Sequence, residues 1–134
     1  MAHHIGKVGE YAIIRNTQGQ FLMVLLHDPQ QWHFPGGRID EGEQALEGLH
    51  REIREETGIT VTNVVPVHTT IFTDEWKYGV FYTADAVEPS EIRCSAEHCD
   101  VRWFSLEELD QIDFWQPFYR ELIEKYVYKN HLKR

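Results

Sequence analysis

Three glutamates lie close together in one short segment of this 134-residue chain. Glu52, Glu55 and Glu56 are spaced i, i+3 and i+4, which places them on one face of a helix within an arc of roughly 100°. Like charges at this spacing repel each other, and near the C-terminal end of a helix they also oppose its macrodipole. A hard divalent cation such as Mg²⁺ or Mn²⁺ would reverse the sign of this interaction and bridge to phosphate oxygens. The alternative interpretation is a solvated acidic face without a function.

The residues around these glutamates favour the metal-binding interpretation. The stretch from Gly37 to Ile59 matches, position for position, the pattern G-x5-E-x7-R-E-U-x-E-E-x-G-U, in which U is a bulky aliphatic residue. Nine specified positions at fixed spacing make a chance match very improbable. The chain here resembles the Nudix family. The resemblance extends to the segment 32–35 before the double glycine and to Glu97, which is similar to the family's additional acidic residue outside this box.

The resemblance implies an α/β (α+β) Nudix fold, a mixed β-sheet sandwiched between α-helices, with residues 1–134 forming a single domain. It also implies Mg²⁺-dependent hydrolysis of a nucleoside diphosphate linked to another moiety, with Mn²⁺ as an alternative cation. The expected substrate of such a MutT-like pyrophosphohydrolase is a small nucleotide, for instance a nucleoside triphosphate. The alternative is a catalytically weak Nudix-fold nucleotide-binding or regulatory module, which is disfavoured because every catalytic position of the pattern is occupied.

The same resemblance assigns roles to residues in and beside the pattern. Glu52 is implied to be a metal ligand or the general base, and Arg51 to orient the neighbouring carboxylates. Glu43 would complete the charge network. Glu97 is implied to be a further ligand or base, and the alternative for it is a solvated loop acid. The implied metal ligands are Gly37 through its backbone carbonyl, Glu52, Glu55, Glu56 and Glu97.

Substrate contacts are expected in two other places. Many relatives end the second strand with basic residues that touch phosphate, but Phe21–His27 has no arginine, so His27 or Arg38 is expected to take that role. The aromatic segment Phe114–Phe118 precedes the last predicted helix, where the family often builds its base pocket. The alternative for Trp115 is packing on the core. The candidate substrate-binding residues are Arg38, His27, Trp115, Gln116 and Phe118.

Periodicity predicts the elements that must position these residues. Apolar residues recur at three- and four-residue spacings from Ala45 to Ile53, which predicts an amphipathic helix over Gln44–Thr57 that Gly58 caps. Ser105 and Glu108 have the spacing of a capping box that opens a short helix. A closing helix is expected over 117–128. Strands are expected over 9–15, 21–27, 32–34, 59–67, 69–73, 78–87 and 101–104, the first two joined as a hairpin.

Composition narrows the classes of partner. The net charge of −9 would be repelled by phosphate backbones and anionic lipids, so neither a nucleic-acid polymer nor a membrane is an expected partner. No apolar run approaches the roughly 20 residues of a membrane span. Cys94 and Cys99 are too few for a disulfide-stapled fold, and with His98 they do not make the four ligands of a structural zinc. We therefore expect a cytoplasmic protein that acts on a small-molecule nucleotide, either as a monomer or as a homodimer.

Overall fold

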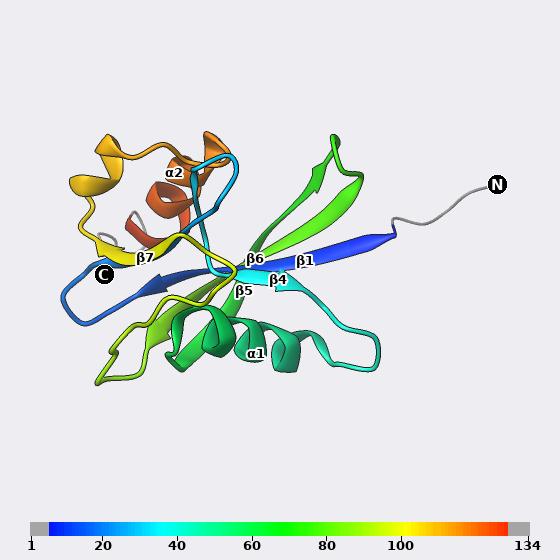
Figure 1. The fold of residues 1–134 in the computed structure, drawn as a ribbon, viewed down its shortest axis with the longest axis horizontal. Helices are drawn as coiled ribbons and strands as arrows, with labels where there is room; N and C mark the ends of the chain where they lie inside the picture. The colour runs from blue at the N-terminus through cyan, green and yellow to red at the C-terminus, as the bar shows by residue number, and fades with distance from the viewer. Residues whose placement is uncertain (1–5, 129–134) are drawn as a thin grey trace.

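A seven-stranded mixed sheet lies between helices in the computed structural model, which describes residues 6–128 (Figure 1). Helix α1 covers one face of the sheet, and the C-terminal helical segments lie on the other. This confirms the predicted fold class. The elements are β1 (Lys7–Arg15), β2 (Phe21–Leu25), β3 (Trp32–His33), β4 (Gly36–Arg38), α1 (Ala45–Thr57), β5 (Val61–Phe72), β6 (Lys77–Ala86), β7 (Asp100–Phe104), the 3₁₀ turn η1 (Glu108–Gln111), α2 (Phe118–Ile123) and the π-helical turn η2 (Glu124–Tyr128).

Strand β1 occupies the middle of the sheet. The strand order is β3-β2-β1-β6-β5, and in addition β4 pairs with β1 and β7 with β2. β1 runs parallel to β6 over its whole length, whereas its pairs with β2 and β4 are antiparallel. The short β4 lies beside the first half of β1, with Glu10 opposite Gly37 and Tyr11 opposite Gly36. The double glycine is therefore held directly against the central strand.

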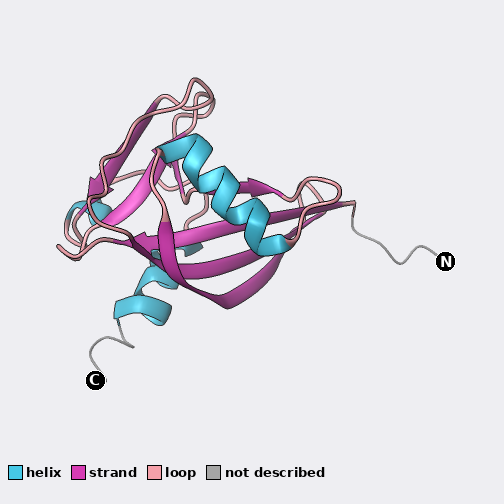
Figure 2. Cartoon of the chain, turned by 90° about the horizontal axis from the view of Figure 1, so that it is seen from below, coloured by secondary structure: helices cyan, strands magenta, loops and turns pink. Residues whose placement is uncertain are grey.

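The two faces of the sheet carry separate cores, because successive side chains of a strand point to opposite sides. On one face, Ala12 and Ile14 of β1 belong to the same buried cluster as Leu49 and Ile53 of α1. On the other face, Ile13 belongs to the aromatic-rich cluster of the α2 side. Figure 2 shows α1 lying across the sheet and the second helical segment on the far side. None of the helices in residues 6–128 combines the length and apolar character that crossing a bilayer requires.

Some predicted boundaries differ from the structure. The strands expected over 59–67 and 69–73 are one strand, β5, whose pairing with β6 is interrupted by two register shifts. β5 lies at the edge of the sheet and has a partner strand on one side only. Proline has no backbone N–H, and an edge strand tolerates Pro66 because no second strand needs that donor. Ser105 and Glu108 make the reciprocal hydrogen bonds of a capping box, but the turn that follows is 3₁₀ rather than α-helical. Gly58 caps α1 with a φ of 79°, as predicted.

His33 is a buried polar group within the α2-side core. Its Nδ1–H donates to the carbonyl oxygen of Phe34 at 2.7 Å, and its Nε2 accepts from the hydroxyl of Tyr119 at 3.0 Å. These partners hold the imidazole in its neutral form. Burial lowers the pKa of His33 to about 4.

This lowered pKa predicts a loss of stability in mild acid. The unfolded chain binds the proton near pH 6.5 and the folded chain only near pH 4, so stability is lost as the pH falls between these values, by up to about 3 kcal/mol. Urea unfolding of the wild type and of His33→Gln should show the free energies of unfolding converging as the pH falls from 7 to 4.5. Parallel pH profiles for the two proteins would contradict this assignment.

Candidate active site

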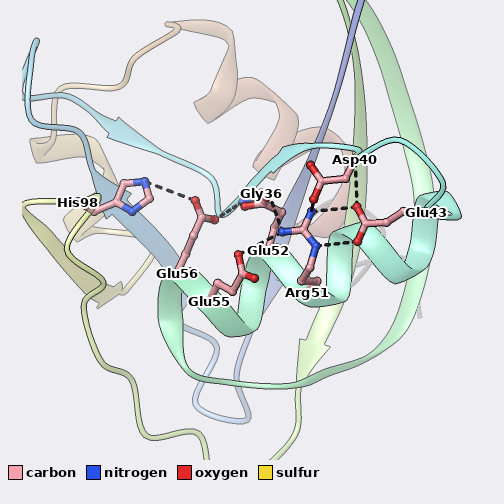
Figure 3. Close-up of polar contacts among 8 residues, drawn as sticks. All are labelled: Gly36, Asp40, Glu43, Arg51, Glu52, Glu55, Glu56 and His98. Carbon is pink, nitrogen blue, oxygen red and sulfur yellow. Dashed lines mark hydrogen bonds and ion pairs between the residues drawn. The ribbon is translucent and has the colours of Figure 1, made fainter.

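Helix α1 presents its three glutamates at very different depths (Figure 3). Leu49 and Ile53 are fully buried against the sheet, and they fix the rotation of the helix about its axis. With that rotation, 62% of the Glu55 side chain is exposed to solvent, whereas only 7% of the Glu56 side chain is. Glu52 is intermediate. The acidic face therefore turns from solvent into the protein along a single helical turn.

Arg51 connects this face to the loop before the helix. Its Nε and Nη2 donate to the two carboxylate oxygens of Glu43 at 2.6 and 2.9 Å, a bidentate pair. Nη2 also lies 3.1 Å from Asp40, and Nη1 lies 3.1 Å from both Glu52 and Glu55. The hydrogen bonds from Arg51 lower the pKa of Glu43 to about 2. The guanidinium thus contacts four carboxylates, two from the loop and two from the helix.

Glu56 is held by a backbone N–H and lies outside the contacts of Arg51. One of its oxygens accepts from the backbone N–H of Gly36 at 2.7 Å, and the other lies 3.4 Å from Nε2 of His98. Burial raises the pKa of Glu56 to about 8, and the negative charges of Glu52, Glu97 and Glu55 add to this rise. Burial likewise raises the pKa of Glu52, with smaller upward contributions from Glu55 and Glu97. The acidic side chains of this cluster thus outnumber the basic side chains that contact them.

The double glycine lets backbone and carboxylate approach each other closely. A Cβ on Gly37 would lie 2.7 Å from the carboxylate carbon of Glu52, closer than real contacts permit. Gly36 has a φ of +149°, and a Cβ there would lie 2.0 Å from the backbone oxygen of Glu10. Backbone geometry therefore requires glycine at position 36, whereas a side chain at position 37 would displace the carboxylate of Glu52, which lies directly against the Gly37 backbone.

Glu10 is a site residue that the sequence analysis missed. Glu10 is only 1% exposed to solvent, and its carboxylate accepts a hydrogen bond from the hydroxyl of Tyr82 at 3.0 Å. Burial, together with the negative charges of Glu43 and Glu52, raises the pKa of Glu10 to about 7. A Cβ on Gly48 would lie 3.0 Å from Glu43 and 3.4 Å from Glu10. The carboxylates of Glu43 and Glu10 thus occupy the space beside Gly48, which is consistent with a glycine in the middle of the helix. The only sequence signal for Glu10 was an acidic residue within an otherwise apolar strand.

Glu97 reaches the helix on the loop between β6 and β7. The backbone N–H of Arg93 donates to Thr57 at the end of α1, and that of Cys99 donates to Leu25 of β2. Between these anchors, Glu97 lies close enough to raise the pKa values of Glu52 and Glu56. The next residue, His98, lies 3.4 Å from Glu56, so this loop brings Glu97 beside the acidic face from a distant part of the chain.

The candidate substrate residues lie in three places. His27 contacts the same loop: its Nε2–H donates to the carbonyl of Ala96 at 3.3 Å, and Nδ1 lies 3.0 Å from the sulfur of Cys99. Arg38 is exposed at the end of β4. Trp115 packs on the α2 side of the sheet, with its ring 4.9 Å from that of His33. Gln116 and Phe118 follow it there, half-buried, so the aromatic segment and the glutamates lie on opposite faces of the sheet.

The donor set suits a hard divalent cation. Among residues 6–128, no three acidic, histidine or cysteine side chains are already arranged as a metal cage. Mg²⁺ does not need such a cage, because it commonly uses one or two carboxylates together with waters and substrate phosphates. Asp40, Glu43, Glu52 and Glu55 share the single guanidinium of Arg51, so negative charge remains on this face that such a cation would neutralise. The groups that would hold it are the carboxylates of Glu52, Glu55 and Glu56 and the Gly37 carbonyl.

Comparisons with known proteins show the family and the fold of this chain. A family model described as the NUDIX domain matches residues 7–126. The nucleoside triphosphatase NudI of Escherichia coli is 31% identical over 117 residues, which cover 75% of this chain and 83% of that protein. A relative from Bacillus subtilis is 48% identical over 50 residues, only 37% of this chain and 34% of its own length. The crystal structure of a MutT protein from Methanosarcina mazei superposes with a TM-score of 0.72 at 26% identity, covering 92% and 94% of the two chains.

The acidic face predicts that a divalent cation stabilises the folded protein. Binding to the folded state alone at ten times the dissociation constant contributes about 1.4 kcal/mol. For a chain of this length that corresponds to a rise in Tm of about 4–7 °C. A thermal melt with and without millimolar Mg²⁺ or Mn²⁺, at equal ionic strength, measures this shift.

Two variants sharpen this melting experiment. Glu56→Gln should reduce the shift because it removes a buried carboxylate of the acidic face. Glu47→Gln, on the exposed first turn of α1, should keep it. An unchanged Tm for the wild-type protein would count against a metal site on this helix.

Proposed function

The chain belongs to the Nudix hydrolase family, and from this premise we propose that it hydrolyses a nucleoside triphosphate or a similar small nucleotide in a Mg²⁺-dependent reaction. We further propose that residues 1–134 form one such domain and that Mn²⁺ can replace Mg²⁺. The observation that carries the proposal is the carboxylate face of α1, ordered by Arg51 and set against the Gly36–Gly37 backbone. The name of NudI, a nucleoside triphosphatase, supports this class of substrate.

Hydrolysis of a phosphoanhydride requires a base for the attacking water and neutralisation of the charge on the phosphate oxygens. A bound divalent cation supplies the charge neutralisation and helps to orient the phosphates. Glu52 is the residue we assign to the base or to a ligand, because its carboxylate lies against Gly37 and is oriented by Nη1 of Arg51 at 3.1 Å. Its raised pKa favours proton acceptance nearer neutral pH. Glu97 is the second candidate for the base.

The substrate extends, in this proposal, from the acidic face around the double glycine to the α2 side of the sheet. Arg38 directly follows Gly37 and is exposed, so it is placed to contact a phosphate. His27 is a weaker candidate because both of its ring nitrogens already contact the loop that carries Glu97. Trp115, Gln116 and Phe118 are assigned to the nucleobase.

Replacing Glu52 tests the catalytic assignment. Glu52→Gln should lower kcat by at least about two orders of magnitude, because losing a base or metal ligand costs several kcal/mol of transition-state stabilisation. Its stability should change little, since a glutamine oxygen can still accept from Arg51. The measurement is Mg²⁺-dependent release of phosphate or pyrophosphate from a panel of nucleotides.

The control for this test is Glu47→Gln, which removes an exposed carboxylate from the same helix and should leave turnover unchanged. A Glu52→Gln protein that turns over the true substrate at nearly the wild-type rate would show that the assignment is wrong.

Replacing Trp115 tests the nucleobase assignment. Stacking of a base on an aromatic ring contributes about 1–3 kcal/mol, so Trp115→Ala should raise KM by roughly 5- to 150-fold and leave kcat largely intact. The Tm should fall in any case, because the ring packs on His33 and Phe72. An unchanged KM for the folded variant would mean that Trp115 only completes the core.

A further inference from the structure

Lys77 is a buried lysine surrounded by aromatic rings on the α2 side of the sheet. Its ammonium nitrogen lies 5.3, 5.0 and 5.6 Å from the ring centroids of Tyr11, Phe72 and Trp115. It donates to the Tyr11 hydroxyl at 2.7 Å and pairs with Glu75 at 3.0 Å. Only 11% of the Lys77 side chain is exposed, but 45% of the Glu75 side chain is. The pair therefore forms the polar rim of an aromatic cluster.

The hydrogen-bonding capacity of this pair is only partly used. An ammonium has three N–H donors, and an ionised carboxylate has about four acceptor positions. Within residues 6–128, the Tyr11 oxygen and the Glu75 carboxylate are the acceptors that Lys77 contacts. One donor of Lys77 and most acceptor positions of Glu75 thus remain for a ligand, side by side. The hydrogen bond from Lys77 lowers the pKa of Glu75, which keeps it an ionised acceptor.

This pair lies at the same end of the sheet as the double glycine. Tyr11, which accepts from Lys77, is opposite Gly36 in the pairing of β1 with β4. Arg38 is close enough to Glu75 to contribute to the lowering of its pKa. The proposed phosphate contact at Arg38 and the proposed base contacts at Lys77 and Glu75 therefore lie at the same end of the sheet.

A donor next to an ionised acceptor matches the edge of one base better than the others. Guanine presents the acceptor O6, the donor N1–H and the donor 2-amino group in a row. Adenine presents its 6-amino donor where guanine has O6, which would face the ammonium with a second donor. A phosphate group is a poorer match to this rim, because the Glu75 carboxylate would repel it.

We propose that Lys77 and Glu75 determine specificity for guanine, with Lys77 donating to O6 and Glu75 accepting from N1–H and the 2-amino group. This inference rests on the proposed function, because it takes a nucleotide as the ligand of the site. It adds to that function the identity of the base. It also gives Lys77 a role that aromatic packing alone does not require.

Paired binding and activity measurements on single-atom analogues test the proposal. The wild type should bind GMP more tightly than AMP or IMP in calorimetric titrations, and it should show the same order for the triphosphates in kcat/KM. Removing a hydrogen bond to a charged group commonly changes affinity by about tenfold or more. Lys77→Met should therefore lower the preference for GMP over AMP by about tenfold. Glu75→Gln should weaken the preference for GMP over IMP, because its single amide oxygen cannot accept from both N1–H and the 2-amino group, and IMP lacks the 2-amino group.

Matched variants separate specificity from general effects of charge. Lys7→Met removes a neighbouring lysine, and Asp74→Asn a neighbouring carboxylate, and both should keep the wild-type order of the bases. If Lys77→Met fails to fold, Glu75→Gln still decides, because its side chain is half-exposed. Equal losses for all bases in Glu75→Gln, or no guanine preference in the wild type, would overturn the proposal.

The same measurements distinguish failure of the inference from failure of the proposed function. Tight GMP binding without hydrolysis of any nucleotide would remove the proposed function and leave the base assignment standing. Hydrolysis of nucleotides without regard to the base would keep the proposed function and remove the role of Lys77 and Glu75.

Discussion

The guanidinium of Arg51 holds together carboxylates that would otherwise repel one another. In the described chain it contacts Asp40 and Glu43 from the loop before α1, and Glu52 and Glu55 from the helix itself. Bidentate geometry makes the contact to Glu43 both strong and directional. Because the loop and the helix share this one cation, it fixes the carboxylates of the loop relative to those of the helix. Glu56 lies outside this network and is fixed instead by the N–H of Gly36.

The alternation of β1 connects the two halves of the site. Glu10 points toward α1 and the acidic face, and its neighbour Tyr11 points toward the aromatic cluster that contains Lys77 and Trp115. β4 pairs with both residues through the double glycine. A single pair of adjacent residues thus relates the proposed phosphate chemistry on one face to the proposed base recognition on the other. A shift of β1 by one residue would exchange these two environments.

Sequence reasoning located the acidic face because its signal is local. The spacing of Glu52, Glu55 and Glu56 fixes their common face on a helix, and the structure has that helix from Ala45 to Thr57. The contacts from Glu10, His98 and Lys77 could not be predicted in this way, because each depends on strand register or on a loop path. The same limit applies to β5, which was predicted as two strands separated at His68, because its continuity there depends on pairing with β6 across a register shift.

The parallel pairing of β1 with β6 has a consequence for how the protein folds. Residues 7–15 find their partners only at 77–85, so the central ladder closes a long chain segment before it gains its hydrogen bonds. Such non-local pairing slows folding, whereas α1 can form early from local contacts. During synthesis, the glutamates of α1 are therefore made before the sheet that orients them can be completed.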